Sequence, residues 1–241
     1  MITNTRGIVF HLVKYGDTGA VIKVFTEDYG LLAFLVKGLH NKRSRIRSNL
    51  FGKLSLLNMS ISFHPNKNLQ HMREASLAHN YTSISQDIRK STVLMFLNEM
   101  VYKSIREEET NRALFQLIYR SLIWFDRQEE HFANFHLHFL IALTRHLGFF
   151  PATDYTAEKN IFDLEEGHFT KYRPRHTHII PHPLSQTFYR LATSNLENMP
   201  AIQVKREERR ALLENILSFY RIHLPGFHEI RSYPVLQTIL E

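Results

Sequence analysis

The sequence predicts an α+β protein of two domains, an N-terminal five-stranded β-barrel at residues 1–80 and an all-α domain at residues 81–241. Two observations support this division. Apolar residues occur in short, turn-bounded runs up to Asn80 and at helical spacing after it. The charge balance changes at the same point. Residues 1–80 hold 11 basic residues (Lys and Arg) and 4 acidic residues (Asp and Glu), whereas residues 81–241 hold 19 basic and 19 acidic residues. A neutral helical domain is therefore expected to follow a basic β domain.

Five strands are expected in the first domain. Asp28-Tyr29-Gly30 marks a hairpin turn between two β-rich runs. Leu57 to Phe63 alternates apolar and polar residues, as a half-buried strand does. The expected strands cover residues 7–13, 21–26, 31–36, 54–63 and 69–76. Five short strands with one long charged loop suit a small closed barrel of the OB kind, and an SH3-like barrel gives much the same pattern.

The segment that follows the hairpin, residues 37–53, is cationic and contains no Asp or Glu. Like charges so closely spaced repel one another, so they are either a solvated surface or a site for an anion. We expect the anion to be a nucleic-acid backbone. The residues expected to contact it are Lys37, Lys42, Arg43, Arg45, Arg47 and Lys53. Tyr15, Phe34 or Phe63 could add base stacking if any of them faces outward.

Helical periodicity begins after Asn80, and Asn111 is a candidate N-cap. The expected helical segments are residues 93–105, 114–122, 132–147, 184–196, 204–223 and 235–240. Gly148 and Pro151 end the third of these segments, as residues of these types commonly do. Residues 152–183 are polar, aromatic and rich in Pro and His, so they predict an irregular insertion within the all-α domain.

Several classes of protein are excluded by what the sequence lacks. The chain has no cysteine, which rules out disulfides, thiolate zinc sites and cysteine nucleophiles. No apolar run approaches the roughly 20 residues that a membrane helix needs, and the N-terminus does not resemble a signal peptide. A cytoplasmic protein is therefore expected. The phosphate-binding, dinucleotide-binding and metalloprotease motifs are also missing, so an enzyme is not expected.

The insertion contains a group of histidines that could in principle bind zinc. They are His168, His176, His178 and His182. Structural zinc sites nearly always include cysteine, so the simpler interpretation is a set of surface histidines on a Pro-rich loop. No cofactor is expected.

Short motifs along the chain, taken in order, resemble the bacterial RecO family of DNA-repair proteins. They include Gly7-Ile8-Val9, Tyr15-Gly16-Asp17, Tyr29-Gly30, Val36-Lys37-Gly38, Gly148-Phe149-Phe150-Pro151 and Leu224-Pro225-Gly226. The resemblance spans nearly the whole chain and rests on order and spacing, because no single motif is diagnostic.

The resemblance implies an OB-fold followed by a helical domain, in a cytoplasmic, nucleoid-associated recombination mediator. Proteins of this family bind single- and double-stranded DNA and anneal complementary strands. With RecR they help to load RecA onto DNA coated by single-strand-binding protein (SSB). Many members carry a four-cysteine zinc ribbon in the segment corresponding to residues 152–183, and this chain lacks those cysteines.

The resemblance also implies a docking site for the acidic, Phe-ended C-terminal tail of SSB. Such a site needs an apolar pocket rimmed by cations. The sequence does not select among the arginines of the predicted helices and their flanking loops, which include Arg106, Arg112, Arg120, Arg127 and Arg145.

Two other functions remain open from the residues alone. An RNA-binding OB protein would have the same electrostatics, with added contacts to the 2′-OH. A non-catalytic scaffold would use the basic loop to dock an acidic protein. Parallel titrations with DNA and RNA distinguish all three functions.

Overall fold

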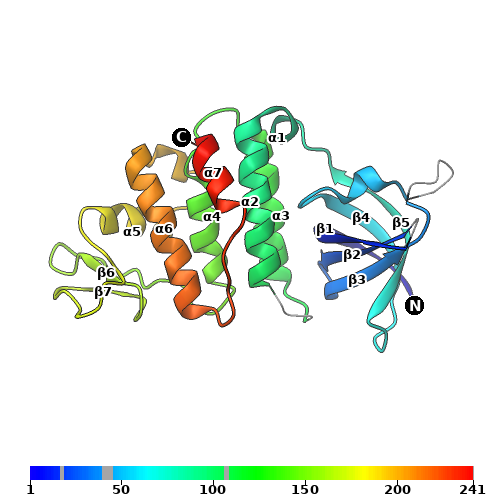
Figure 1. The fold of residues 1–241 in the computed structure, drawn as a ribbon, viewed down its shortest axis with the longest axis horizontal. Helices are drawn as coiled ribbons and strands as arrows, with labels where there is room; N and C mark the ends of the chain where they lie inside the picture. Colours follow the sequence, from blue (N-terminus) through cyan, green and yellow to red (C-terminus); the bar gives the residue numbers. More distant parts are fainter. Residues whose placement is uncertain (17–18, 40–45, 106–108, 241) are drawn as a thin grey trace. The chain divides into compact units, whose positions relative to one another are not determined.

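The computed structural model describes residues 1–16, 19–39, 46–105 and 109–240, and its N-terminal part is a closed five-stranded barrel (Figure 1). Of the sequence-predicted site residues, Lys42, Arg43 and Arg45 lie outside the described residues, as does Arg106 among the candidates for partner binding. The barrel strands are β1 (Ile2–Tyr15), β2 (Gly19–Thr26), β3 (Gly30–Val36), β4 (Leu56–Ser62) and β5 (Leu69–His79). A short 3₁₀ helix, η1 (Ser48–Phe51), lies between β3 and β4.

The strand order β1-β2-β3-β5-β4 closes because β1 pairs with both β2 and β4. One pair, β3 with β5, is parallel, whereas the others are antiparallel. This topology confirms the OB-type barrel that the strand pattern left open against an SH3-like one.

Local chemistry explains the hairpin between β2 and β3. Gly30 has a φ of +69°, a backbone conformation that glycine adopts without strain. The hydroxyl of Thr26 donates to the carbonyl of Gly30 at 2.8 Å and accepts from the backbone N–H of Tyr29 at 3.1 Å. The buried hydroxyl of Thr26 thus satisfies two backbone groups of the turn, the carbonyl of Gly30 and the N–H of Tyr29.

Alternate residues of the strands fill the barrel. Ile22, Val24, Phe34 and Ile61 have no measurable exposure, as the two-residue period of a strand predicts. Gly7 lies where β1 passes over this core, and a Cβ there would come within 2.5 Å of Met59 and Val24. The absence of a side chain at position 7 therefore allows β1 to approach the core closely.

Helices make up most of the chain after the barrel, as expected. They are α1 (Ser83–Gln86), α2 (Ile88–Ser104), α3 (Arg112–Arg127), α4 (Phe135–Thr144), α5 (Leu184–Thr193), α6 (Arg206–His223) and α7 (Tyr233–Leu240). A 3₁₀ turn, η2 (Met199–Ala201), precedes α6. The expected cap is present, because the side-chain oxygen of Asn111 accepts from the backbone N–H of Leu114 at 2.9 Å.

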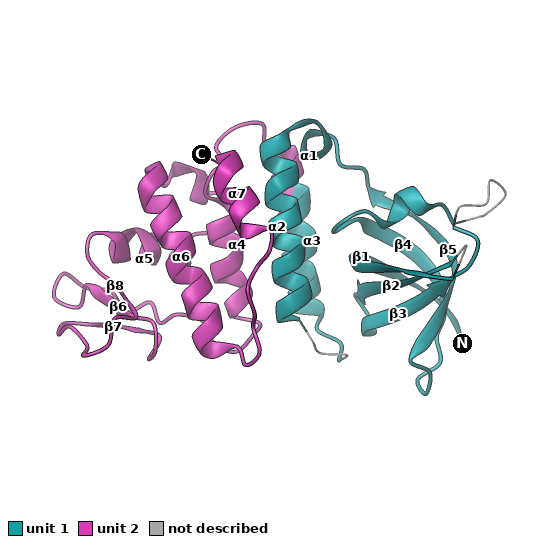
Figure 2. Ribbon diagram, in the orientation of Figure 1, with its two compact units in different colours: residues 1–123 teal, residues 124–241 magenta. Residues whose placement is uncertain are grey.

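The chain divides into two compact units, residues 1–123 and residues 124–241 (Figure 2). Helix α2 and most of α3 belong to the first unit together with the barrel. Helices α4 to α7 belong to the second.

The second unit also contains a small sheet within residues 152–183, where the sequence predicted irregular structure. Its strands are β6 (Ile161–Asp163), β7 (His168–Thr170) and β8 (Ile179–Ile180), in the order β7-β6-β8. Strands of two or three residues are too short to show an alternating pattern, which explains why the sequence did not reveal them.

Candidate nucleic-acid interface

Three segments of the barrel approach one another at the end where β1 finishes. Tyr15 pairs with Gly19 across the β1–β2 turn, and Ala20 pairs with Val36 at the end of β3. Lys37 follows Val36 directly and is exposed. An exposed tyrosine and a lysine are thus placed at the same end of the barrel, on the two strands that flank β2.

A groove of about 500 Å³ runs between the end of β3 and the β4–β5 hairpin. We call it the barrel groove. Its polar ionisable lining residues are Lys37, His64, Lys67, His71 and Arg73. No Asp or Glu lines it among the residues that the structure describes, and Leu35 and Leu69 provide apolar surface beside the cations. A cationic groove with apolar patches matches what a single-stranded nucleic acid requires.

The cations of the hairpin are held in place by neighbouring side chains. Gln70 is buried, and its amide nitrogen donates to the carbonyls of His64 and Lys67 at 2.9 and 2.6 Å. Its amide oxygen accepts from the backbone N–H of His64 at 2.9 Å. Arg73 donates from Nε to the Ser62 hydroxyl at 2.8 Å. One buried amide therefore fixes the turn that carries Lys67.

The sequence-predicted cations are only partly brought together. Lys37 lines the barrel groove, and Arg47 is exposed directly after Ile46, which also lines it. Lys53 is exposed beyond η1 and is not among the residues of the groove. Sequence reasoning missed Lys67 and Arg73.

The three aromatic candidates differ in exposure. Phe34 is fully buried in the barrel, which excludes it from stacking on a base. Phe63 is half-buried and packs against Tyr29 with ring centroids 4.4 Å apart. Tyr15 is 61% exposed, so of the three it has the ring most available to a ligand.

The described acidic residues of the barrel lie in a different groove. Glu27, Asp28 and Glu74 all line a polar groove of about 560 Å³ that also contains Arg6. Arg6 donates to both carboxylate oxygens of Glu27 at 2.7 Å, and this contact lowers the pKa of Glu27. Arg112 of α3 donates to Asp28 at 2.7 Å. Glu27 and Asp28 are thus paired with arginines outside the barrel groove, so they do not offset its positive charge.

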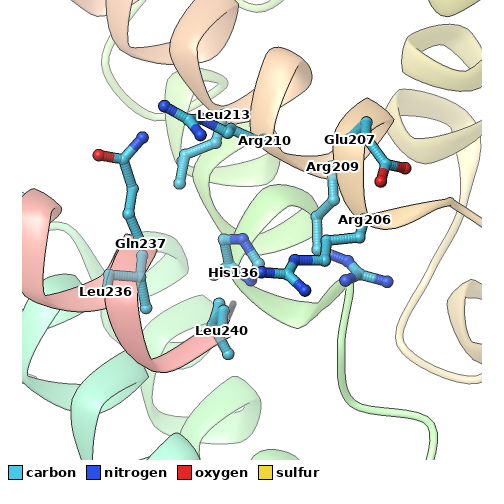
Figure 3. Close-up of a pocket in the computed structure, with 9 residues that line it drawn as sticks. All are labelled: His136, Arg206, Glu207, Arg209, Arg210, Leu213, Leu236, Gln237 and Leu240. Atoms are coloured by element: carbon cyan, nitrogen blue, oxygen red, sulfur yellow. The ribbon is translucent and has the colours of Figure 1, made fainter.

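The second unit has its own cationic pocket, with a volume of about 360 Å³ (Figure 3). We call it the α6–α7 pocket. Its charged lining residues are Arg206, Glu207, Arg209 and Arg210, all on α6. Leu213, Leu236 and Leu240 give it an apolar wall, and His136 of α4 lies at its base (Figure 3).

Arg209 is the arginine most firmly fixed in the α6–α7 pocket. It donates to the Asn134 side chain at 3.1 Å and to the Val204 carbonyl at 2.9 Å, and it forms no ion pair with any described carboxylate. Burial lowers the pKa of Arg209. Burial also lowers the pKa of His136 to about 3, and the nearby charge of Arg209 adds to this effect. The pocket is therefore positive, and its histidine is neutral at neutral pH.

The histidines of residues 152–183 are separated into two groups. His176 and His178 lie together with Glu165, and their ligand atoms are all within 4.8 Å of one another. His168 and His182 are not part of this cluster. The glutamate was not among the sequence-predicted ligands, because its proximity depends on how the small sheet folds.

No helix in the described parts of the chain has the length and apolar character needed to cross a membrane.

Comparison with known proteins identifies the family. The model described as recombination protein O N terminal matches residues 1–81, and the one described as recombination protein O C terminal matches residues 85–232. The chain belongs to the RecO family. This confirms the resemblance inferred from the order of short motifs, and it places the chain among proteins of DNA repair.

Curated RecO relatives match this chain over the full length, or nearly the full length, of both sequences. The chain is 36% identical to the DNA repair protein RecO of Bacteroides fragilis, with 100% of both chains covered. It is 32% identical to those of Phocaeicola vulgatus and Flavobacterium johnsoniae, with 99% of each chain covered.

Proposed function

We propose that this RecO chain is a DNA-binding recombination mediator that holds DNA along the barrel groove. The observation that carries the proposal is that Lys37, Lys67 and Arg73 line one groove of the barrel, whereas the described acids Glu27, Asp28 and Glu74 line another. Because no described Asp or Glu lines the barrel groove, a phosphate backbone would meet positive charge there without a competing carboxylate.

Two kinds of contact support this role. Lys37, Lys67 and Arg73 would neutralise phosphates and release their counterions, and each contact adds roughly 0.7 to the salt dependence on a single strand. Tyr15 would stack on a base at the end of the groove. The sequence-predicted residues Lys42, Arg43, Arg45, Arg47 and Lys53 would add further phosphate contacts.

Annealing would then follow without bond chemistry. Two complementary strands repel each other through their phosphates, and a cationic groove that screens this repulsion brings them together. On this account the protein is not an enzyme, binds single- and double-stranded DNA, and acts in the cytoplasm at the nucleoid. With RecR it would assist RecA loading. The domains would be a DNA-binding domain at residues 1–80 and a helical domain at residues 81–241.

The α6–α7 pocket is our proposed docking site for the C-terminal tail of SSB. Its size accommodates one large apolar side chain, its wall is formed by leucines, and its rim is arginine-rich. An acidic peptide that ends in Phe would place its ring against Leu213 and its carboxylates near Arg206 and Arg210.

A salt titration tests the DNA site. The variant K37A/K67A/R73A should bind an oligonucleotide more weakly whatever its sequence, and its log Kd against log salt should be flatter by roughly 2. The control R120A/R127A/R190A removes the same charge from exposed helical positions and should retain both the affinity and the slope. Unchanged binding in the first variant would move the site off the barrel groove, and tighter binding to RNA of the same sequence would favour the RNA-binding alternative.

A further inference from the structure

A compact group of metal-ligating side chains lies at one end of the small sheet in the second unit. Glu165 lies in the turn between β6 and β7, and His176 and His178 lie on the segment that enters β8. The rings of His176 and His178 lie side by side, with centroids 6.1 Å apart, so the two imidazoles can face one ligand. Chain segments 13 residues apart in sequence thus meet around one point.

The distances in this cluster fit a metal ion. The Nδ1 atom of His178 lies 2.8 Å from a carboxylate oxygen of Glu165, and the Nε2 atom of His176 lies 3.7 Å from the other oxygen. Bonds of roughly 2.0–2.1 Å in a tetrahedral zinc site place the ligand atoms about 3.3–3.4 Å apart. Small side-chain adjustments would therefore bring all three residues into coordination.

Asp163 lies beside this cluster, outside the group whose ligand atoms are all within 4.8 Å of one another, and is our candidate for a fourth ligand. Its Oδ2 atom lies 3.3 Å from Nε2 of His176, and its side chain is 7% exposed. Its other oxygen accepts from the backbone N–H groups of Glu165 and Glu166 at 2.9 and 3.1 Å. These two bonds fix the carboxylate and leave Oδ2 directed at the histidine.

The charge of the cluster also calls for a cation. Neither Asp163 nor Glu165 forms an ion pair with a Lys or Arg in the described ranges, and their ion-pair contacts there are the histidines themselves. With neutral imidazoles the group carries two uncompensated negative charges. A divalent ion would neutralise them.

The orientation of His176 favours coordination through one nitrogen. Its Nδ1 atom is buried and has no hydrogen-bond partner among the described residues. Its Nε2 atom is the one that faces Asp163 and Glu165. Nε2 is thus the ring nitrogen that is directed into the cluster.

We propose that Asp163, Glu165, His176 and His178 bind one Zn²⁺ ion, which clamps the β6–β7 turn to the segment entering β8. Nitrogen and carboxylate oxygen are both zinc ligands, and four of them complete a tetrahedral site. This set differs from a four-cysteine ribbon and requires no thiolate. The proposal does not depend on the DNA-binding function.

The test uses the full chain after dialysis against EDTA. Calorimetric titration with ZnCl₂ should show one ion bound per chain, and thermal unfolding should shift to higher temperature with zinc. Titration with CoCl₂ should give the visible absorption of a tetrahedral site. In H178A and E165Q the Kd should rise at least about tenfold, and the thermal shift should disappear.

Matched controls come from the same segment. H168A and E166Q change an exposed histidine and an exposed glutamate outside the cluster, and both should bind zinc as the unmodified chain does. E165Q keeps the size of the side chain, so its far-UV circular dichroism should be unchanged and loss of binding would not reflect unfolding. No saturable binding in the unmodified chain, or equal binding in H178A and H168A, would overturn the proposal.

Discussion

Tyr15 is exposed and lies at the same end of the barrel as Lys37, so its effect on DNA binding can be predicted. Replacing it with Ala should weaken single-strand binding by ~1–3 kcal/mol, or roughly 5- to 150-fold, because one stacked base is lost. Y15F retains the ring and should bind normally. Fluorescence anisotropy with single- and double-stranded oligonucleotides measures both.

Tyr172 provides the control, because it is 77% exposed and lies in the second unit. Y172A should bind as the unmodified chain does. Equal losses in Y15A and Y172A, or a loss in Y15A confined to duplex DNA, would contradict stacking at Tyr15.

His136 makes stability depend on pH. Its folded pKa of about 3 lies below the unfolded value of roughly 6.5, so the unfolded chain binds the proton more readily between these values. The stabilisation is complete above about pH 6.5 and is lost as the pH falls towards 3. Urea unfolding at several pH values should show a smaller decline for H136Q than for the unmodified chain. Parallel declines in the two proteins would mean that His136 is not the group responsible.

The residues of the candidate site show how much the sequence could predict. Lys37 was identified because it lies in a charge run without acids, and the structure places it in the barrel groove. Lys67 and Arg73 were not identified, because each is an isolated cation near a turn. They line the same groove as Lys37 because β3 pairs in parallel with β5, which brings together segments distant in sequence.

At the level of elements, periodicity found the barrel strands and the longer helices but not their ends. The first strand was expected at residues 7–13 and extends from Ile2 to Tyr15, because β4 and β2 pair with its two halves. The third helical segment was expected at residues 132–147, whereas α4 spans Phe135–Thr144. Pairing and packing with distant segments set the ends of these elements, and neither can be predicted from the local sequence alone.

Helix α6 allows the partner proposal to be tested. A synthetic acidic peptide with Phe at its free C-terminus should bind the chain, and R206A/R210A should weaken this binding at least about tenfold because charged contacts are lost. Fluorescence anisotropy of a labelled peptide provides the measurement. R221A, an exposed arginine of the same helix outside the pocket, should leave the affinity unchanged. Normal binding by R206A/R210A would place the tail elsewhere, with Arg112, Arg120, Arg127 and Arg145 as the next candidates.

At the scale of the whole molecule, charge distribution was the most informative property of the sequence. The excess of cations in residues 1–80 predicted which part of the chain would carry an anion-binding surface. In the described part of the barrel, the groove that holds Lys37, Lys67 and Arg73 is lined by no Asp or Glu, and this arrangement depends on strand pairing that composition does not contain. The full-length match to RecO relatives agrees with the DNA-repair role expected from the motif order.

Annealing on SSB-coated DNA is the most direct test of the proposed mediator. Two complementary labelled oligonucleotides are coated with the cognate SSB and mixed with the unmodified chain, K37A/K67A/R73A or the control R173A/R190A/R221A, which removes three exposed arginines of the second unit. We predict faster annealing with the unmodified chain and the control, and no acceleration with the barrel-groove variant. Equal acceleration by all three proteins, or none by the unmodified chain while it still binds DNA, would contradict annealing through the barrel groove.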